Sequence, residues 1–174
     1  MATITSKPVL TDRKDKRLFC RLINKFRDEY YKNESPFDIT PRLLDLMTDP
    51  IRQIYYSDKT PIAICEMTSG QGFGKTTLSV ATVYVKPSYR GQGIANIIYR
   101  DSERIAKELD QVFYIQIEES SLNSNKQKFL NMGFTHFMPL IVTTSSKDYE
   151  AGYKEKAFAL FTQNYENRHL KELA

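Results

Sequence analysis

The sequence predicts one α+β domain built on a mostly antiparallel sheet, and three observations support this. Segments 51–56, 61–68 and 76–85 are rich in β-branched and aromatic residues and have short turn signals between them, which predicts a meander. An amphipathic helical pattern over 94–109 lies between segment 76–85 and another apolar strand at 112–118. This order predicts a strand–helix–strand crossover. No repeat or Pro/Gly/Ser-rich linker interrupts the chain, so we expect a single domain over residues 1–174.

The part of the chain before the meander begins with a strand and continues with two helices. The first helix has apolar residues at helical spacing and a cap at Thr11 or Asp12. The predicted elements are a strand over 3–10, a helix ending near 30–33, a loop over 33–40, and a short helix between Thr40-Pro41 and Asp49-Pro50.

The remaining elements follow in order. Residues 57–59 and 69–75 are predicted to connect the meander strands as hairpin turns. After the central helix we expect a strand over 112–118, a helix over 121–132 closed by Gly133, a strand over 136–143, its partner over 156–162, and a charged tail over 166–174 that is helical or frayed. The predicted order is therefore β-α-α-β-β-β-α-β-α-β-β.

Composition narrows the classes of function. No apolar run approaches the ~18 residues of a membrane span, and the first residues lack the apolar core of a secretory signal, so we expect a cytoplasmic protein. Cys20 and Cys65 cannot form a disulfide framework, and with only two histidines we expect no metal site. The net charge of +4 permits a polyanionic partner but makes nucleic acid an unlikely one.

The most informative segment is a basic, glycine-rich turn between a strand and a helix, Arg90-Gly91-Gln92-Gly93-Ile94-Ala95. Glycines let the backbone approach a ligand closely, and the first N–H groups of a helix have no partners within it. Together with the helix dipole and Arg90, this arrangement predicts a phosphate-binding loop. The alternative is a tight turn that binds nothing.

These six residues match the pattern R/Q-x-x-G-x-G/A, and the chain resembles the GNAT N-acetyltransferase superfamily. The preceding Val83-Tyr84-Val85-Lys86-Pro87 resembles that family's fourth strand, and Phe129–Phe134 resembles the end of its fourth helix. The resemblance implies about seven strands flanked by about four helices, with a splay between the fourth and fifth strands.

The resemblance also implies acetyl-coenzyme A as cosubstrate. Its pyrophosphate is expected on the N–H groups of residues 91–95, and its pantetheine arm beside the fourth strand. The residues expected to bind it are Val83, Tyr84, Val85, Arg90, Gly91, Gln92, Gly93, Ile94, Ala95, Asn123 and Asn125. For both asparagines the alternative is a helix cap.

The expected catalytic groups depart from the family pattern. Phe129 stands where many members carry a tyrosine acid, and residues 78–85 contain no carboxylate. We therefore expect Glu118 as the base, with Tyr84 as a further catalytic candidate. The alternative for Glu118 is a solvated carboxylate at a strand end. A backbone N–H near Tyr84 or Val85 is expected to stabilise the oxyanion.

The acceptor is expected to be a primary amine, on a small molecule, a peptide N-terminus or a lysine. Tyr31, Glu34 or Asp38, and Glu66 on the strand over 61–68, are the expected substrate contacts, because acidic groups suit a cationic amine. The alternative function is an acyl-CoA-binding module of weak catalytic power, which the absence of the tyrosine favours. We expect a monomer or a homodimer.

Overall fold

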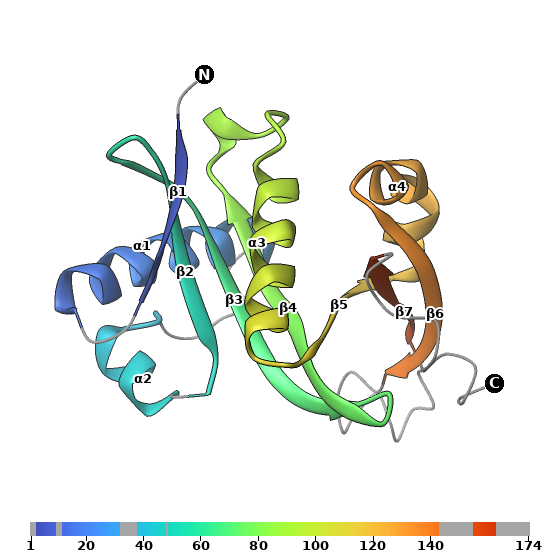
Figure 1. Ribbon diagram of the computed structural model, residues 1–174. Coiled ribbons are helices and arrows are strands. Elements are labelled where there is room, and N and C mark those ends of the chain that lie inside the picture. The colour runs from blue at the N-terminus through green and yellow to red at the C-terminus, as the bar shows by residue number, and fades with distance from the viewer. Residues whose placement is uncertain (1–2, 10–11, 32–37, 48, 143–154, 163–174) are drawn as a thin grey trace. The chain divides into compact units, whose positions relative to one another are not determined.

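The computed structural model describes residues 3–9, 12–31, 38–47, 49–142 and 155–162 (Figure 1). Its element order confirms the predicted one. The helices are α1 (Arg13–Tyr31), α2 (Pro41–Leu46), α3 (Ile94–Glu108) and α4 (Glu119–Asn131), with a 3₁₀ turn η1 at Pro87–Tyr89. The strands are β1 (Ile4–Pro8), β2 (Ile51–Ser57), β3 (Thr60–Gly72), β4 (Lys75–Val85), β5 (Val112–Glu118), β6 (Phe134–Val142) and β7 (Glu155–Thr162).

The described strands form one seven-stranded sheet in the order β1-β2-β3-β4-β5-β7-β6. The pairs β1–β2, β2–β3, β5–β7 and β6–β7 are antiparallel, whereas β4 and β5 run parallel, as a crossover through α3 requires. The predicted fold class, a mostly antiparallel sheet with four helices, is confirmed. The chain forms two compact units, residues 1–69 with 80–101 and residues 70–79 with 102–174, and each is described by itself.

Helix α1 supplies the core of the first unit. The Lys14 N–H donates to the Asp12 carboxylate at 2.7 Å, so Asp12 provides the predicted cap. The face of α1 at helical spacing is buried against α2 and three strands, in a cluster that comprises Phe19, Cys20, Leu22, Ile23, Leu44, Ile54, Ile64 and Tyr84. This packing, more than helix propensity, stabilises α1.

The two faces of the sheet in this unit carry different helices. Neighbouring strand residues point to opposite faces. Ile54 belongs to the cluster under α1, whereas the Tyr55 hydroxyl donates to Asp101 of α3 at 2.9 Å. Helices α1 and α2 therefore cover one face, and the first part of α3 covers the other.

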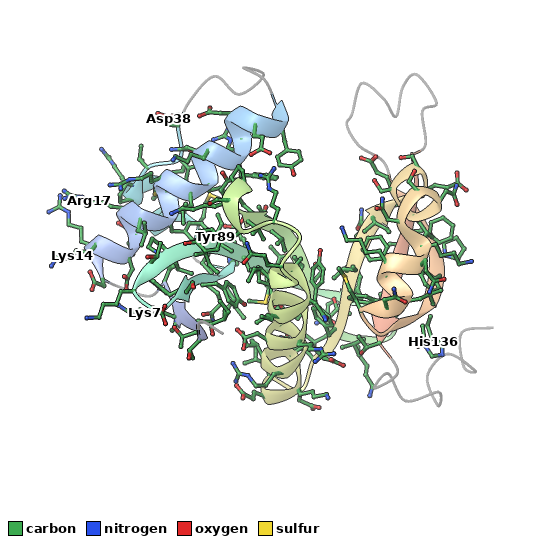
Figure 2. All side chains as sticks on the ribbon, turned by 90° about the horizontal axis from the view of Figure 1, so that it is seen from above. Lys7, Lys14, Arg17, Asp38, Tyr89 and His136 are labelled. Atoms are coloured by element: carbon green, nitrogen blue, oxygen red, sulfur yellow. The ribbon has the colours of Figure 1, made fainter. Side chains whose placement is uncertain are left out.

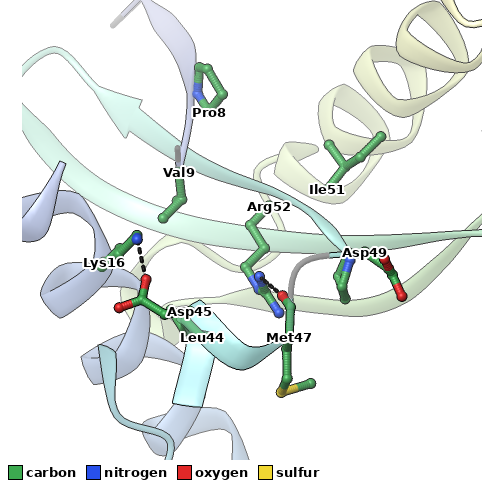
Figure 3. Close-up of a pocket in the computed structure, with 10 residues that line it drawn as sticks. Pro8, Val9, Lys16, Leu44, Asp45, Met47, Asp49, Ile51 and Arg52 are labelled. Carbon is green, nitrogen blue, oxygen red and sulfur yellow. Dashed lines mark hydrogen bonds and ion pairs between the residues drawn. The ribbon is translucent and has the colours of Figure 1, made fainter. Parts of the chain in front are cut away.

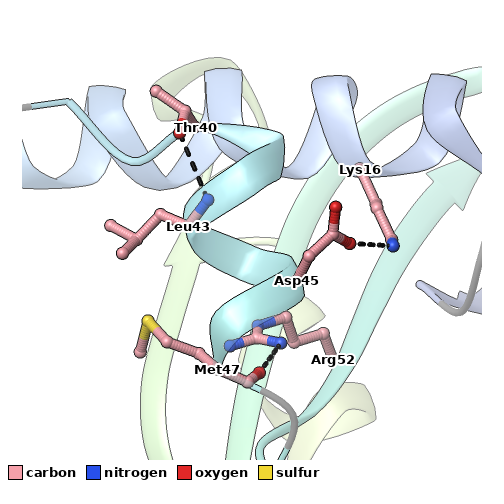
Figure 4. Close-up of polar contacts among 6 residues, drawn as sticks. All are labelled: Lys16, Thr40, Leu43, Asp45, Met47 and Arg52. Carbon is pink, nitrogen blue, oxygen red and sulfur yellow. Dashed lines mark hydrogen bonds and ion pairs between the residues drawn. The ribbon is translucent and has the colours of Figure 1, made fainter.

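Helix α2 begins as predicted at Thr40-Pro41. The Leu43 N–H donates to the Thr40 hydroxyl at 3.3 Å (Figure 4). The segment before it is joined to α1 because the Asn24 amide both donates to the Ile39 carbonyl and accepts from its N–H, at 3.0 and 2.8 Å. These two bonds fix the position of Ile39, which lines a cavity described below.

The hairpin connection between β3 and β4 is shorter than the one predicted over 69–75. Strand β3 runs on to Gly72, and only Phe73 and Gly74 form the turn, both with positive φ (53° and 71°). A two-residue turn of this kind matches the twist of a hairpin. The Phe73 ring contacts Tyr114 and Phe161 edge-on, with centroids 5.3 and 5.0 Å apart. Ring packing in the second unit therefore compensates for an unfavourable φ at a non-glycine residue.

Replacing Gly74 by alanine is expected to lower the free energy of unfolding by about 1 kcal/mol, because a Cβ is disfavoured at this φ. Urea denaturation measures the change. Gly72→Ala is the matched control, since its Cβ would make only ordinary contacts with Thr77 and its backbone is not left-handed. Equal stability of the two variants would contradict the role of Gly74.

The rest of the second unit is organised around β7, which lies between β5 and β6. Small buried residues of β7, Ala157 and Ala159, pair with Leu140 and Met138 of β6. Helix α4 ends at Asn131, and Gly133 follows with φ 97°, which confirms the predicted left-handed cap. The strand after it begins at Phe134, two residues earlier than expected.

Candidate active site

A short turn joins β4 to α3 in the first unit. The Lys86 N–H donates to the Ile62 carbonyl of β3 at 2.9 Å, which holds the end of β4 to the sheet. Proline at position 87 then starts the 3₁₀ turn, closed by the Tyr89 N–H on the Lys86 carbonyl and the Arg90 N–H on the Pro87 carbonyl. The chain is thereby turned within a few residues from strand to helix.

Gly91 and Gly93 have φ of 76° and 78°, a backbone conformation that favours glycine. A Cβ placed on either residue would meet no atom within 4 Å. The missing side chains therefore leave bare backbone facing open space at the start of α3. We call residues 90–95 the phosphate loop. We call the open space beside its two glycines, which a Cβ on either residue would occupy, the cradle.

The donors of this cradle are backbone N–H groups of the first helical turn. Those of Asn96 and Ile97 already donate to the Gly93 carbonyl, at 3.1 and 3.2 Å. The N–H groups of Ile94 and Ala95 have no acceptor within the helix. The Ile94 side chain is only 5% exposed and anchors the turn, while the Gln92 amide donates back to the Ser88 carbonyl at 3.1 Å. The loop fits an anionic ligand such as a pyrophosphate.

Arg90 contacts protein groups. Its guanidinium pairs with the Glu29 carboxylate through two nitrogens, at 2.6 and 2.8 Å, and its Nε donates to the Val85 carbonyl at 2.9 Å. The hydrogen bond from Arg90 lowers the pKa of Glu29 below its usual value. The same bond raises the pKa of Arg90. Glu29 therefore stays ionised and paired down to a pH below the ordinary glutamate pKa.

A cavity of about 190 Å³ lies in the same unit, between α1, α2 and the strands β3 and β4. Apolar residues make up most of its wall, with Glu66, Thr82 and Arg27 as the polar members. The Glu66 carboxylate accepts from Arg52 Nε at 2.8 Å, and both side chains are largely buried. Arg52 therefore neutralises part of the Glu66 charge, and the remaining negative charge in an apolar wall can bind a cationic group. Thr82 and Arg52 have no sequence pattern that marks them as site residues.

Tyr84 lies between the cavity wall and the phosphate loop. It is 4% exposed, its ring centroid is 6.2 Å from that of Phe26, and the Arg90 guanidinium carbon is 5.8 Å from the same centroid. Burial, and secondarily the charge of Glu29, raise the pKa of the Tyr84 phenol. The hydroxyl is therefore protonated at neutral pH. Val83 and Val85, its neighbours on β4, are half-buried.

A second, larger cavity of about 430 Å³ lies beside α2, where β1 ends and β2 begins (Figure 3). Its wall mixes apolar residues with two cations and two carboxylates, and Lys16 is paired with Asp45 across it. Arg52 donates from Nη1 to the Met47 carbonyl at 2.9 Å and so contributes to this wall as well (Figures 3 and 4).

Glu118, Asn123 and Asn125 lie in the second unit. Glu118 is exposed at the end of β5 and is the N-cap residue of α4, with the Ser120 hydroxyl 3.5 Å from its carboxylate. The capping alternative for the two asparagines is wrong, because α4 already begins at Glu119. Both are exposed within the helix, and Asn125 donates to the Ser121 carbonyl at 3.1 Å.

The acceptor residues expected near the end of α1 are described only in part. Tyr31 is the last residue of α1, but its side chain lies outside the described residues, as does all of Glu34. Asp38 is exposed (Figure 2). Phe129, at the usual position of the tyrosine acid, has its ring edge-on to the buried Phe134 with centroids 6.3 Å apart, so it serves packing.

The comparison with protein families decides the identity of the fold. Residues 19–134, more than half of the chain, match the acetyltransferase (GNAT) family. The chain belongs to this family. The matched region includes the phosphate loop, Arg90–Ala95, and the segment Phe129–Phe134 at the end of α4. Among curated proteins, none matches the sequence significantly.

Solved structures of GNAT-like proteins share the fold at low sequence identity. An aminoglycoside acetyltransferase from an uncultured soil metagenomic sample, in complex with sisomicin, superposes with a TM-score of 0.66 at 10% identity, covering 82% of this chain and 95% of that one. An N-acetyltransferase from Staphylococcus aureus Mu50 has a TM-score of 0.62 at 15% identity, covering 92% and 98%. A putative acetyltransferase from Salmonella typhimurium, with its cofactor acetyl-CoA, has 0.60 at 14%, covering 94% and 96%.

Two other features are absent from the described residues. Within the described ranges, no helix of this GNAT protein is both long and apolar enough to cross a membrane. The same residues include no cluster of three or more histidine, cysteine or acidic side chains arranged to hold a metal ion. Cys20 and Cys65 are both buried in the first unit.

Proposed function

We propose that this GNAT protein is an N-acetyltransferase that moves the acetyl group of acetyl-CoA to a primary amine by direct attack in a ternary complex. The observation that carries the proposal is the phosphate loop, in which two glycines with positive φ open the first N–H groups of α3 to an anion. The related Salmonella structure with acetyl-CoA adds support.

The residues proposed to bind the cosubstrate are those expected from the sequence. The backbone N–H groups of Gly91 to Ala95 would bind its pyrophosphate, and the backbone of Val83 to Val85 its pantetheine arm. Asn123 and Asn125 are further proposed contacts. Acetyl-CoA, when bound, supplies a thioester as the acyl donor. The neutral Tyr84 phenol keeps a proton at neutral pH and is the proposed acid for the leaving thiolate.

We place the acceptor in the cavity of about 190 Å³. Its wall is apolar except for a few polar groups, and Glu66 gives it a carboxylate for a cationic amine. Since Arg52 already shares that carboxylate, we expect it to orient the acceptor and not to remove its proton. Tyr31 and Glu34 remain proposed contacts. A monomer or homodimer in the cytoplasm stays a prediction.

Glu118 is the proposed base. An alkylamine has a pKa of about 10.4 and must lose a proton before it attacks. The exposed Glu118 carboxylate can accept that proton directly or through water. We expect Glu118→Gln to lower kcat by at least about 100-fold while KM for acetyl-CoA changes little. Steady-state thiol release measures both, with Glu119→Gln as the neighbouring control. Full activity of Glu118→Gln would remove it as base.

An acyl-CoA-binding module is the second candidate, because Phe129 packs against Phe134 where an acid is usual. The test of both is incubation with acetyl-CoA and a panel comprising an aminoglycoside, a free peptide N-terminus and a lysine peptide, followed by free-thiol titration. Amine-dependent thiol release supports the transferase. Tight CoA binding without release on any acceptor supports the module.

A further inference from the structure

Glu29 lies at a place where a carboxylate is unfavourable. It is in the last turn of α1, where the helix dipole is negative, and that turn contains no basic residue. The charge that compensates for it comes from Arg90, 61 residues later in the chain, through two nitrogen–oxygen contacts of 2.6 and 2.8 Å. Two-point pairing of this kind fixes the plane of the guanidinium.

The same guanidinium contacts the end of β4. Its Nε donates to the Val85 carbonyl, and its carbon lies 5.8 Å from the centre of the Tyr84 ring. All three nitrogens thus have a protein partner, and the side chain joins α1, β4 and the phosphate loop. We call the pair formed by Glu29 and Arg90 the clasp.

The clasp is close to both proposed ligand sites. Arg90 immediately precedes Gly91, the first glycine of the cradle. Glu29 is one helical turn after Phe26, whose ring lines the cavity of about 190 Å³ and contacts Tyr84. A movement of the loop relative to α1 would therefore alter the cradle and the cavity wall together.

We infer that Arg90 is a positioning residue: the clasp holds the phosphate loop on helix α1, and the signature arginine does not bind phosphate itself. The inference rests on the proposed function, since it concerns binding of CoA to this loop. The backbone N–H groups then carry phosphate recognition, and Glu29 strengthens it despite its own negative charge.

A double-mutant cycle on CoA affinity tests the inference. Calorimetric titration of CoA compares wild type, Glu29→Gln, Arg90→Gln and the double variant. We expect each single variant to bind CoA about three- to tenfold more weakly, the range for one half-exposed ion pair that orders a loop. The double variant should bind no more weakly than either single one. Glu108→Gln, which breaks the exposed Arg104–Glu108 pair of α3, should leave affinity unchanged.

Other outcomes overturn the inference. If Arg90 binds phosphate directly, Glu29→Gln frees it, and affinity stays equal or rises while Arg90→Gln still weakens binding. Arg90→Lys separates the two roles, because lysine keeps the charge but cannot reach both Glu29 oxygens and the Val85 carbonyl. Wild-type affinity in Arg90→Lys would contradict the clasp. Absence of CoA binding in wild type would overturn the proposed function, whereas wild-type binding that ignores Glu29→Gln overturns the inference alone.

Discussion

Replacing Gly93 by glutamate is expected to abolish CoA binding, with affinity lower by at least about 1000-fold. The residue has φ 78°, so any side chain costs about 1–2 kcal/mol of backbone strain. The new Cβ would fill the open space above the loop, and the carboxylate would place a negative charge where the phosphates are expected. Calorimetric titration with CoA measures the loss, and circular dichroism checks the fold.

Gly74→Glu is the matched control for this variant. Gly74 also has a positive φ, 71°, and open space around its Cβ position, but it lies in the β3–β4 turn. The two substitutions therefore introduce the same side chain with comparable backbone strain. We expect Gly74→Glu to lose stability and keep its CoA affinity. Loss of binding in both variants would mean that strain, and not the phosphate loop, explains the effect.

Truncating Phe19 to alanine is expected to lower the free energy of unfolding by about 3–5 kcal/mol. The side chain is 0% exposed, belongs to the cluster between α1 and the sheet, and has the Arg52 guanidinium 6.0 Å from its ring centre. It also lines the cavity of about 190 Å³, so its removal enlarges an existing space that neighbouring residues do not fill.

Urea denaturation of Phe19→Ala measures this loss. Leu46→Ala in α2 is the control, because Leu46 is 75% exposed and its truncation should change stability by about 0.5 kcal/mol or less. A loss below about 1 kcal/mol in Phe19→Ala would show that the cluster under α1 is not the core of the first unit.

The order of elements could be predicted because the local signals were strong. Asp12, Thr40-Pro41 and Gly133 mark helix ends by mechanisms that depend only on nearby atoms. The hairpin between β3 and β4 was predicted, but the extent of its turn could not be predicted in the same way. Its strand ends are polar and rich in glycine, and they are extended because they pair with each other across a turn whose Phe73 packs on rings from distant segments.

In the candidate site, too, the parts that are contiguous in sequence could be predicted and the contact between distant residues could not. The two glycines, the strand before them and the helix after them are contiguous, so their arrangement follows from the sequence. The partner of Arg90 does not, since Glu29 is 61 residues away and only tertiary folding brings the two together. The one indication in the sequence was Glu29 itself: a carboxylate in the last turn of a helix, with no basic residue in that turn, favours a cation from elsewhere in the chain.

The alternative for Asn123 and Asn125, that they cap a helix, is wrong for a local reason. Asn123 and Asn125 were candidate caps because asparagine favours helix starts. Strand β5 instead passes directly into α4 at Glu118 and Glu119, without an intervening turn. The two asparagines therefore lie inside the helix.

NMR tests directly whether the phosphate loop binds the phosphates of CoA. Backbone amide signals of the ¹⁵N-labelled protein are followed during titration with CoA. We expect the largest shifts on the N–H groups of Gln92, Gly93, Ile94 and Ala95, because a pyrophosphate accepts from them. Saturable binding of CoA that leaves these four signals in place would contradict it.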